Sequence, residues 1–385
     1  MTIAELHQNE ELRRHEFPVA RDKIFLAHAG VCPLPRRVCQ AISDYAAEAA
    51  TGDQEKFVFP EILDEGRRLA AGLLGCRPGE IAFVGPTSLA LSFVASGLKF
   101  RRGDNVLVYF DDYPSNVYPW MALAEQGVEV RLMNTRSLGE IRVRDVIGQV
   151  DENTRLVALA SCHFISGYRI DIPAIGAWLR SRGILFCVDG IQTLGAFPTT
   201  VEHVDFLAAD AHKWLLGPCA AGLLYVREAV QPALNPPVHG WHNVRCPDFV
   251  AQEQIEFRKD ARKFEAGTHN LLGLVGLMAS IRLLQEIGIE AIAADLVRKR
   301  NWLVPELVAR GFTVLQADAP EGSRSGIVSV SHPARDLAAL QAQLAEQRVM
   351  TSLRVARGGR KFLRISPHFY NTDAELRRFL ELLPA

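Results

Sequence analysis

Short apolar runs and longer segments of helical period alternate along the chain between about residue 60 and residue 228. This alternation is typical of a parallel β-sheet that helices cover on both faces. Helices are expected between the strands, for example at 88–98, 119–126 and 175–182. In such a sheet ligands bind at the carboxyl ends of the strands, so the turns that follow the strands are the first place to look for function. The seven predicted strands are 81–84, 105–110, 128–133, 156–160, 184–188, 206–209 and 222–226.

The pattern changes after residue 228, where a Pro-rich connection (QPALNPPVHGWHN) precedes a long helical pattern at 271–288. We therefore predict a large domain over 18–270 and a small α+β domain over 271–385. Residues 1–17 are expected to pack with the small domain. The other predicted elements of the small domain are helices at 290–309 and 372–383 and strands near 312–316 and 326–331.

Charge and composition exclude several classes of function. The 43 basic and 44 acidic side chains leave a net charge of −1, which argues against a nucleic-acid or anionic-membrane partner. Mean hydropathy is +0.05, and no apolar run approaches the roughly 18 residues that span a bilayer. The polar, acidic start is unlike an export signal. The seven cysteines form no C-x-x-C pair, so we expect reduced, mostly buried thiols in a cytoplasmic protein.

The chemistry of the chain centres on a carboxylate and an amine. P-loop, dinucleotide-binding, nucleophile-elbow and H-E-x-x-H motifs are absent from the sequence. Asp189 ends one predicted strand, and Lys213 follows the next. Adjacent strands lie about 4.8 Å apart, so both groups can reach one small ligand. Pyridoxal 5′-phosphate needs this pair, because an amine holds its aldehyde as a Schiff base and a carboxylate keeps its ring nitrogen protonated.

Two further turns supply what else this cofactor needs. Thr87 and Ser88 follow a Gly-Pro turn at the start of a predicted helix, where backbone N–H groups and the helix dipole favour a phosphate. Tyr113 follows the strand that ends near Phe110 and offers a flat ring for stacking. Taken singly, the lysine fits a surface residue, the Thr-Ser pair an N-cap and the tyrosine an edge residue. Their order on successive turns favours a cofactor site.

The motifs that carry these residues resemble those of the class V aminotransferase family. This family of fold-type I pyridoxal-phosphate enzymes includes cysteine desulfurases, kynureninase-like enzymes, C–S lyases and isopenicillin N epimerase-like proteins. The resemblance covers nearly the whole chain and implies a homodimer with shared active sites. Its markers are IFLAHAGVCPLP (24–35), GPTSLAL (85–91), YPSNVYPW (113–120), SGYRIDI (166–172), VDGIQTLG (188–195), AHKWLLGP (211–218), KFEAGTHN (263–270) and LRISPHFYNT (363–372).

The resemblance implies a role for each matched residue. Lys213 would form the Schiff base and then move the Cα proton of an amino-acid substrate, and Asp189 would pair with the pyridinium nitrogen. Arg364 would clamp the substrate α-carboxylate, with His28 and Gly30 nearby. The remaining cofactor contacts would be Gln192 on the ring hydroxyl oxygen, Tyr113 on the ring face, Thr87, Ser88 and His212 on the phosphate, and Thr268 on the phosphate of a second subunit.

Four positions depart from the family pattern. The stretch 349–364 has no cysteine, so we expect no sulfur transfer through a protein persulfide. Asp210 stands where desulfurases often have a phosphate-binding Ser, so either it points away or the phosphate depends more on Thr87 and Ser88. His163 either replaces an amide donor to the cofactor hydroxyl or is a core histidine. Ala220 replaces a Gly and should narrow a backbone approach.

Two other groups of residues allow alternative interpretations. Arg354, Arg357 and Arg360 lie in one loop that either meets a second anionic group of the substrate or is simply solvated. His239 and His242 resemble a metal pair, but without a carboxylate or Cys at ligand spacing a mobile flap is the expected role. No metal site is predicted.

These observations predict a pyridoxal-phosphate enzyme that acts at Cα of an amino acid, first of all an aminotransferase. The alternative is a β-eliminating C–S lyase, or an epimerase, without a persulfide cysteine. A different class of function is a non-catalytic cofactor-binding sensor or scaffold.

Overall fold

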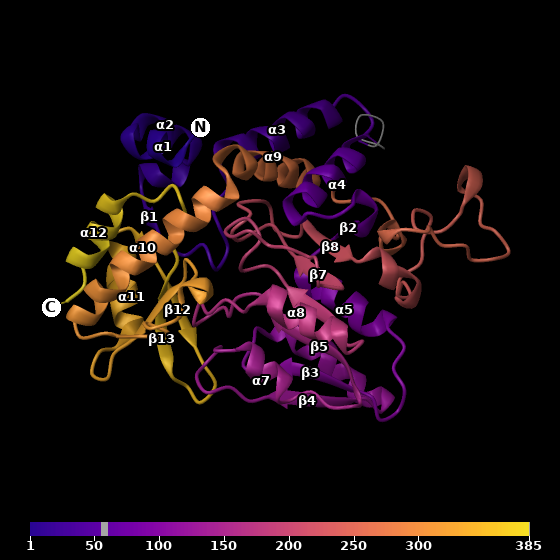
Figure 1. Ribbon diagram of the computed structural model, residues 1–385. Coiled ribbons are helices and arrows are strands. Elements are labelled where there is room, and N and C mark those ends of the chain that lie inside the picture. Colours follow the sequence, from indigo (N-terminus) through magenta and orange to yellow (C-terminus); the bar gives the residue numbers. More distant parts are fainter. Residues whose placement is uncertain (55–60, 385) are drawn as a thin grey trace.

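The structure is a computed structural model that describes residues 1–54 and 61–384. Residue 60, where the alternation was expected to start, and residue 385 lie outside the described residues. The large domain is built on a seven-stranded sheet in the order β2-β8-β7-β6-β5-β3-β4 (Figure 1). Its strands are β2 (Ile81–Val84), β3 (Asn105–Tyr109), β4 (Glu129–Met133), β5 (Thr154–Ala160), β6 (Leu185–Asp189), β7 (Phe206–Ala209) and β8 (Gly222–Val226).

The expected α/β architecture with a seven-stranded, mostly parallel sheet is confirmed. Only β8 runs against its neighbours, pairing antiparallel with both β2 and β7, while the other pairs are parallel. The central strands are apolar and buried along their whole length, as in a sheet covered on both faces. Each predicted strand matches an observed one to within about two residues.

Helices cover the two faces of this sheet. Helix α5 (Thr87–Gly97) packs against β7 and β8, and α8 (Ile172–Ser181) packs against β6 (Figure 1). A further layer is formed where α9 (Leu271–Ile287) packs on α3 (Arg36–Ala49) and α4 (Glu61–Leu74). The shorter helices of this part are α6 (Tyr118–Met121) and α7 (Val143–Ile147).

Helix α9 leads into α10 (Ile289–Ala309), and the two axes meet at 75°. Gly288, with φ of +92°, forms this bend. No single described helix is long and apolar enough to cross a membrane, and only this sharply bent pair passes a length and composition test together.

The small domain contains a four-stranded antiparallel sheet in the order β12-β13-β10-β9. The sequence pattern indicated β9 and β10 but not the other two, because β12 and β13 are short and place arginines among their apolar residues. The boundary near residue 270 stays a prediction. The elements are β9 (Thr313–Val314), β10 (Val328–Ser331), β12 (Ser352–Val355), β13 (Lys361–Ile365), α11 (Leu337–Glu346) and α12 (Asp373–Glu381).

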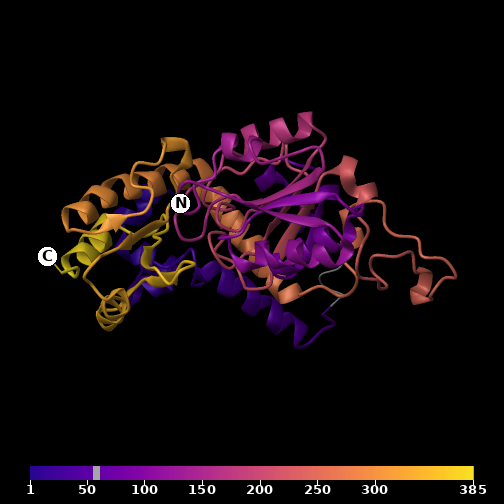
Figure 2. The same cartoon turned by 90° about the horizontal axis from the view of Figure 1, so that it is seen from below.

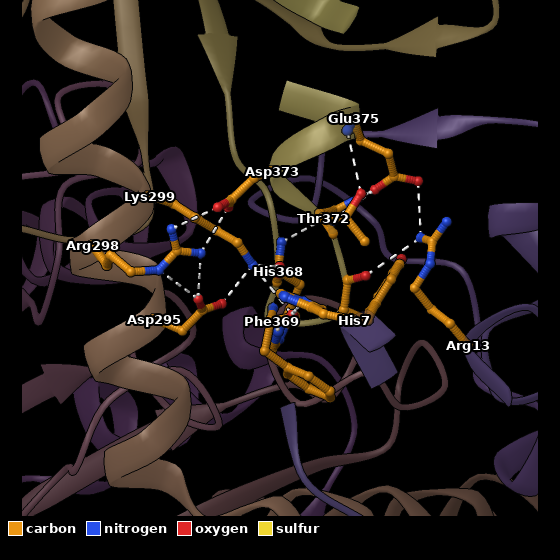
Figure 3. A network of polar contacts seen from close by, with 12 residues as sticks. His7, Arg13, Asp295, Arg298, Lys299, His368, Phe369, Thr372, Asp373 and Glu375 are labelled. Atoms are coloured by element: carbon orange, nitrogen blue, oxygen red, sulfur yellow. Dashed lines mark hydrogen bonds and ion pairs between the residues drawn. The ribbon is translucent and has the colours of Figure 1, made fainter. Parts of the chain in front are cut away.

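The N-terminal segment, helices α1 (Ile3–Gln8) and α2 (Glu10–Glu16), contacts the loop that follows β13. His7 Nε2 lies 2.8 Å from the carbonyl oxygen of Phe369, and Arg13 donates to Glu375 at 2.9 Å (Figure 3). Further along the chain, β1 (Ile24–Phe25) pairs in parallel with β11 (Val349–Met350). These contacts bind the first residues of the chain to its last hundred.

A buried ion pair anchors the same loop from the other side. The ammonium group of Lys299, on α10, binds Asp295 and donates to the carbonyl oxygens of His368 and Phe369 (Figure 3). His368 in turn places Nε2 3.1 Å from the carbonyl oxygen of Trp214. The small domain is therefore connected to the residue that follows Lys213.

An arm of residues 244–257 extends away from the body of the large domain (Figures 1 and 2). An antiparallel bridge between Val244 and Phe257 closes its base. Phe249, Val250 and Ile255 are exposed on it, at 77%, 60% and 67%. Three large apolar side chains are thus exposed on this one protruding segment.

Candidate active site

Lys213 and Asp189 lie at the same edge of the sheet. Asp189 is the last residue of β6, and Lys213 follows β7, the neighbouring strand. Both side chains are buried, and their charges interact. Burial lowers the pKa of Lys213 to about 8 against the opposing effect of Asp189. A lysine with this pKa is partly neutral near pH 7, as a nucleophilic amine must be.

A second buried carboxylate, Asp112, lies beside Asp189. Its Oδ2 accepts the backbone N–H of Ala160 at 3.1 Å, and Ala160 pairs with Asp189 across β5 and β6. Its Oδ1 accepts the N–H of Tyr113 at 2.7 Å. Burial and then the charge of Asp189 raise the pKa of Asp112 to about 7. Asp112 was not among the predicted site residues, although the pair of aspartates at 111–112 directly follows the predicted strand 105–110.

Tyr113 faces the lysine. The centroid of its ring lies 5.2 Å from Lys213 Nζ, and its other neighbour is the ring of Phe164, in an edge-on contact at 5.4 Å. The side chain is 45% exposed, so one side of the ring borders open space. A flat ligand attached to Lys213 would therefore meet the Tyr113 ring, as stacking requires.

The N-terminus of α5, which directly follows the turn after β2, borders the site. None of the described side chains caps this helix, which begins at Thr87. The Thr87 hydroxyl accepts the backbone N–H of Asp210 at 2.9 Å, and its own proton is left to donate. Gly222 approaches so closely that a Cβ there would lie 2.4 Å from the carbonyl oxygen of Gly85. This arrangement forms a narrow backbone cradle of the type that binds phosphate.

Asp210 turns toward backbone amides, away from the start of α5. Its two oxygens accept the N–H groups of Ala211, Ala220 and Ala221, and Oδ2 lies 2.9 Å from Nδ1 of His212. These hydrogen bonds favour the alternative in which the Asp210 carboxylate points away from the expected phosphate position. Ala220 has φ of +57°, a conformation that favours glycine. The alanine that stands here in place of the family's glycine is therefore strained.

Two predicted cofactor residues already have protein partners. Gln192 donates to the carbonyl oxygen of Ala29 at 3.1 Å and accepts from the Trp214 indole at 2.8 Å, which leaves one amide N–H. His163 has both ring nitrogens engaged: Nδ1 with Ser166 and Nε2 with the carbonyl oxygen of Asp111. These contacts are those of a core histidine, and a role of His163 toward the cofactor hydroxyl stays a prediction.

His28 and Gly30 are the two residues expected near the substrate, and that role stays a prediction for both. His28 is fully buried, with Nδ1 2.9 Å from the carbonyl oxygen of Ser366 and Nε2 2.7 Å from the Tyr370 hydroxyl. Burial lowers its pKa to about 3, so it stays neutral in a polar core. It therefore supports the chain beneath the site. Gly30 lies against the guanidinium group of Arg364.

Arg364 enters the site from β13. Its side chain is 1% exposed, and Nη1 donates to the carbonyl oxygen of Phe164 at 2.6 Å. Nε and Nη2 are buried and have no hydrogen-bond partner among the described residues. Burial and the nearby charge of Arg354 lower the pKa of Arg364 to about 9. Unsatisfied buried donors of this kind call for an anionic ligand.

Thr268 is exposed and lies in the segment that follows the arm. Beside it the structure brings together His242, Glu265 and His269, whose ligand atoms lie within 4.8 Å of one another. The sequence analysis found no carboxylate for His242, because Glu265 is 23 residues away in the chain. Glu265 also binds Arg67 and the N–H of Phe83, so its main role is to fasten this segment to α4 and β2.

The residues present fit pyridoxal phosphate. The side-chain amine of Lys213 forms no hydrogen bond with the described residues, and Asp189 uses one oxygen for the N–H of Ile191. The uncapped start of α5, with Thr87 beside it, provides N–H groups where the phosphate would lie. The Lys213 amine thus lies beside the Tyr113 ring and close enough to Asp189 and Arg364 for their charges to shift its pKa.

Comparisons with known proteins agree with this geometry. The chain is 35% identical over 292 residues to a probable cysteine desulfurase of Methanothermobacter thermautotrophicus, covering 74% of this chain and 72% of the relative. It is 29% identical over 380 residues to an uncharacterized aminotransferase, YcbU, of Bacillus subtilis, covering 97% of both.

Solved structures show the same fold. A cysteine desulfurase from Thermococcus onnurineus superposes with a TM-score of 0.89 at 24% identity, covering 97% of this chain and 96% of that one. The cystine C–S lyase C-DES, in complex with cysteine persulfide, gives a TM-score of 0.86 at 22% identity, covering 95% and 98%. The fold is thus that of fold-type I enzymes. The family model for aminotransferase class-V matches residues 24–379, and the chain therefore belongs to this family of pyridoxal-phosphate enzymes.

Proposed function

We propose that the protein is a pyridoxal-phosphate enzyme that acts at Cα of an amino acid. The observation that carries the proposal is the buried Lys213 amine, with its pKa lowered to about 8, between Asp189 and the unpaired guanidinium of Arg364. Bound cofactor supplies an electron sink for negative charge at Cα. Arg364 binds the α-carboxylate through its free nitrogens. Lys213 holds the cofactor and then removes the Cα proton.

Transamination is the first candidate reaction. The turn between β12 and β13, residues 356–360, is short and has no cysteine that could receive sulfur. Cleavage of a C–S bond with release of sulfide is the second candidate. The names of the desulfurase relatives and the likeness to a cystine C–S lyase favour it.

An amino-acid panel separates the two reactions. A transaminase turns over only when an acceptor keto acid is supplied and converts each substrate to its own keto acid. A lyase acting on cysteine needs no acceptor and releases pyruvate, ammonia and sulfide; from cystine the sulfur leaves as cysteine persulfide in place of sulfide. Release of those three products without an acceptor would exclude transamination as the main reaction.

The alternative of a sensor or scaffold is tested by the cofactor itself. Purified protein with pyridoxal phosphate should show a visible absorption band, and borohydride should remove this band while attaching the cofactor covalently to Lys213. The Lys213→Ala variant should show no such band. Colour without turnover of any amino acid would favour the sensor. Protein that stays colourless would overturn the enzyme proposal.

We also propose a homodimer in which Thr268 reaches the cofactor phosphate of the other subunit. The exposed Thr268 and the apolar arm beside it support this arrangement. Mixed dimers of Lys213→Ala and Thr268→Ala subunits provide the test. If Thr268 acts on the partner's site, each mixed dimer contains one intact site and regains up to half of the wild-type activity per dimer. If it acts within its own subunit, no site is restored.

A further inference from the structure

Three arginines of the hairpin formed by β12 and β13 were left with two possible roles, and the structure separates them. Arg357 pairs with Asp111 at 2.6 Å and donates to the carbonyl oxygen of Phe110. Arg360 is exposed and lies over the ring of Phe362 at 4.7 Å. Arg360 does not line the cavity beside Tyr113, whereas Arg357 lines it together with Arg354 but is paired there with Asp111. Arg354 does not share either arrangement.

Arg354 lies on the same face of the hairpin as Arg364. Ser352 is directly opposite Arg364, and Arg354 is two residues further along the same strand. Because side chains alternate between faces, the two arginines are diagonal neighbours on one face. Their Nη2 atoms lie 3.5 Å and 3.6 Å from the position that a Cβ atom on Gly30 would take. Two guanidinium groups thus converge on one point beside the site.

Neither guanidinium is neutralised by a carboxylate among the described residues. Nε of Arg354 and both Nε and Nη2 of Arg364 are buried without hydrogen-bond partners there. Lys213 lies close enough for the charges of both arginines to lower its pKa, and its protonated amine is a third positive charge there. The charges of Asp189 and then Asp210 offset it, while burial raises the pKa of the neighbouring Asp112 to about 7. A buried excess of positive charge is costly unless a ligand supplies the missing negative charges.

One α-carboxylate satisfies only part of this excess. A carboxylate binds one guanidinium in a bidentate manner, which would occupy the free edge of Arg364. Arg354 also lines a cavity of about 650 Å³, together with Tyr113 and Phe164. The cavity provides room for a substrate side chain that extends past Tyr113, and the guanidinium of Arg354 stands at its border.

We propose that Arg354 and Arg364 bind the two anionic groups of one substrate, an amino acid whose side chain ends in a carboxylate or a sulfinate. This inference rests on the proposed function for the site. Arg364 takes the α-carboxylate and Arg354 takes the side-chain anion, so Arg354 determines specificity.

Binding to the holoenzyme tests the proposal without turnover. Succinate and butyrate have the same number of carbon atoms and differ in one carboxylate. The dissociation constant of each is measured from the change in the visible absorption or tryptophan fluorescence of the holoenzyme. We expect succinate to bind roughly tenfold or more tightly than butyrate, as a second charge-assisted pair requires.

Variants assign the preference to Arg354. Arg354→Gln should abolish the preference for succinate and leave butyrate binding within a few-fold of wild type, whereas Arg354→Lys should retain part of it. Arg360→Gln, on the same hairpin but outside the site, is the matched control and should bind like wild type. Circular dichroism and thermal melting confirm that each variant is folded. Equal loss of both ligands in Arg354→Gln would mean that both arginines hold one carboxylate, and would overturn the proposal.

Kinetics with isosteric substrates distinguish side-chain classes. Aspartate and cysteine sulfinate are compared with asparagine, and kcat/KM should favour the anionic substrates by roughly tenfold or more in the wild type. Arg354→Gln should remove that ratio mainly through KM. Turnover of neutral amino acids without any preference for succinate would overturn this inference alone. A preference for succinate without turnover would leave it standing while the proposed reaction fails.

Discussion

The carboxylate of Asp210 lies 2.9 Å from Nδ1 of His212 and at the same time accepts three backbone N–H groups. Two of these donors, Ala220 and Ala221, belong to the turn before β8, and the third is Ala211. Asp210 thus joins the turn that leads to Lys213 with the turn that faces α5. An acidic residue near the expected phosphate position is explained by this bracing role.

Replacing Asp210 by Ala should loosen both turns. Three buried N–H groups would lose their acceptor, and we expect a loss of about 1–3 kcal/mol in the free energy of unfolding. Affinity for pyridoxal phosphate should fall as well, because the Asp210 carboxylate positions His212, whereas the backbone N–H that Asp210 donates to Thr87 is kept in the variant. Thermal denaturation and cofactor titration measure the two effects. Asp210→Asn keeps one acceptor oxygen and should lose less; a more stable Asp210→Ala protein would contradict the bracing role.

The pKa of Lys213 predicts how the apoprotein takes up its cofactor. Attack on an aldehyde needs the neutral amine, and burial lowers the pKa of Lys213 to about 8. The rate at which the visible absorption band forms should therefore rise with pH and level off above about pH 8. Arg354 contributes to the lowering, so Arg354→Gln should move the midpoint to higher pH. A midpoint near 10.5, the ordinary value for lysine, would contradict the buried environment.

Asp112 should make the apoprotein less stable as the pH rises. Its folded-state pKa is raised from 3.8 to about 7, so the folded protein holds a proton that the unfolded chain has lost in this range. Each unit of the shift corresponds to about 1.4 kcal/mol. Relative to wild type, Asp112→Asn should gain stability between pH 4 and pH 7 and stay level above. Urea denaturation at several pH values measures this difference; a difference that does not change with pH would contradict the shift.

Glu265 should be needed for stability. Its replacement by Gln leaves the buried Arg67 with only the exposed carboxylate of Asp64, 3.4 Å away, and we expect a loss of up to about 3–5 kcal/mol. The exposed pair of Glu65 and Arg282 gives a matched control, since Glu65→Gln should cost less than about 1 kcal/mol. Equal effects of the two changes on chemical denaturation would contradict the buried role.

The same carboxylate should make the fold sensitive to acid. Burial alone would raise the pKa of Glu265, but the hydrogen bond from His269 and the charge of Arg67 outweigh it and lower the pKa. Its stabilisation is therefore complete above the ordinary glutamate pKa and is lost as the pH falls through the lowered value. The acid dependence of stability should be weaker in Glu265→Gln than in wild type.

The sheet could be predicted because most of its strands are short, largely apolar runs that end at turn residues. Positions such as Lys213 and Asp189 follow from that register, since both stand at the ends of neighbouring strands. Hydrogen-bond partners could not be predicted in this way. His28 and His163 match motif positions, but their nitrogens are taken by Ser366 and Asp111, which are distant in the chain. Only the folded structure shows which donors remain for a ligand.

The parallel pairing of β1 with β11 has a consequence for biosynthesis. Strand β1 leaves the ribosome early, whereas β11 and β13 emerge near the end of translation. The large sheet can form before β11, the strand that pairs with β1, has been synthesised. This order is usual when domains fold in the order of synthesis. Arg364, on β13, joins Lys213 only afterwards. The buried Lys213 amine thus acquires its guanidinium neighbour in the last stage of assembly.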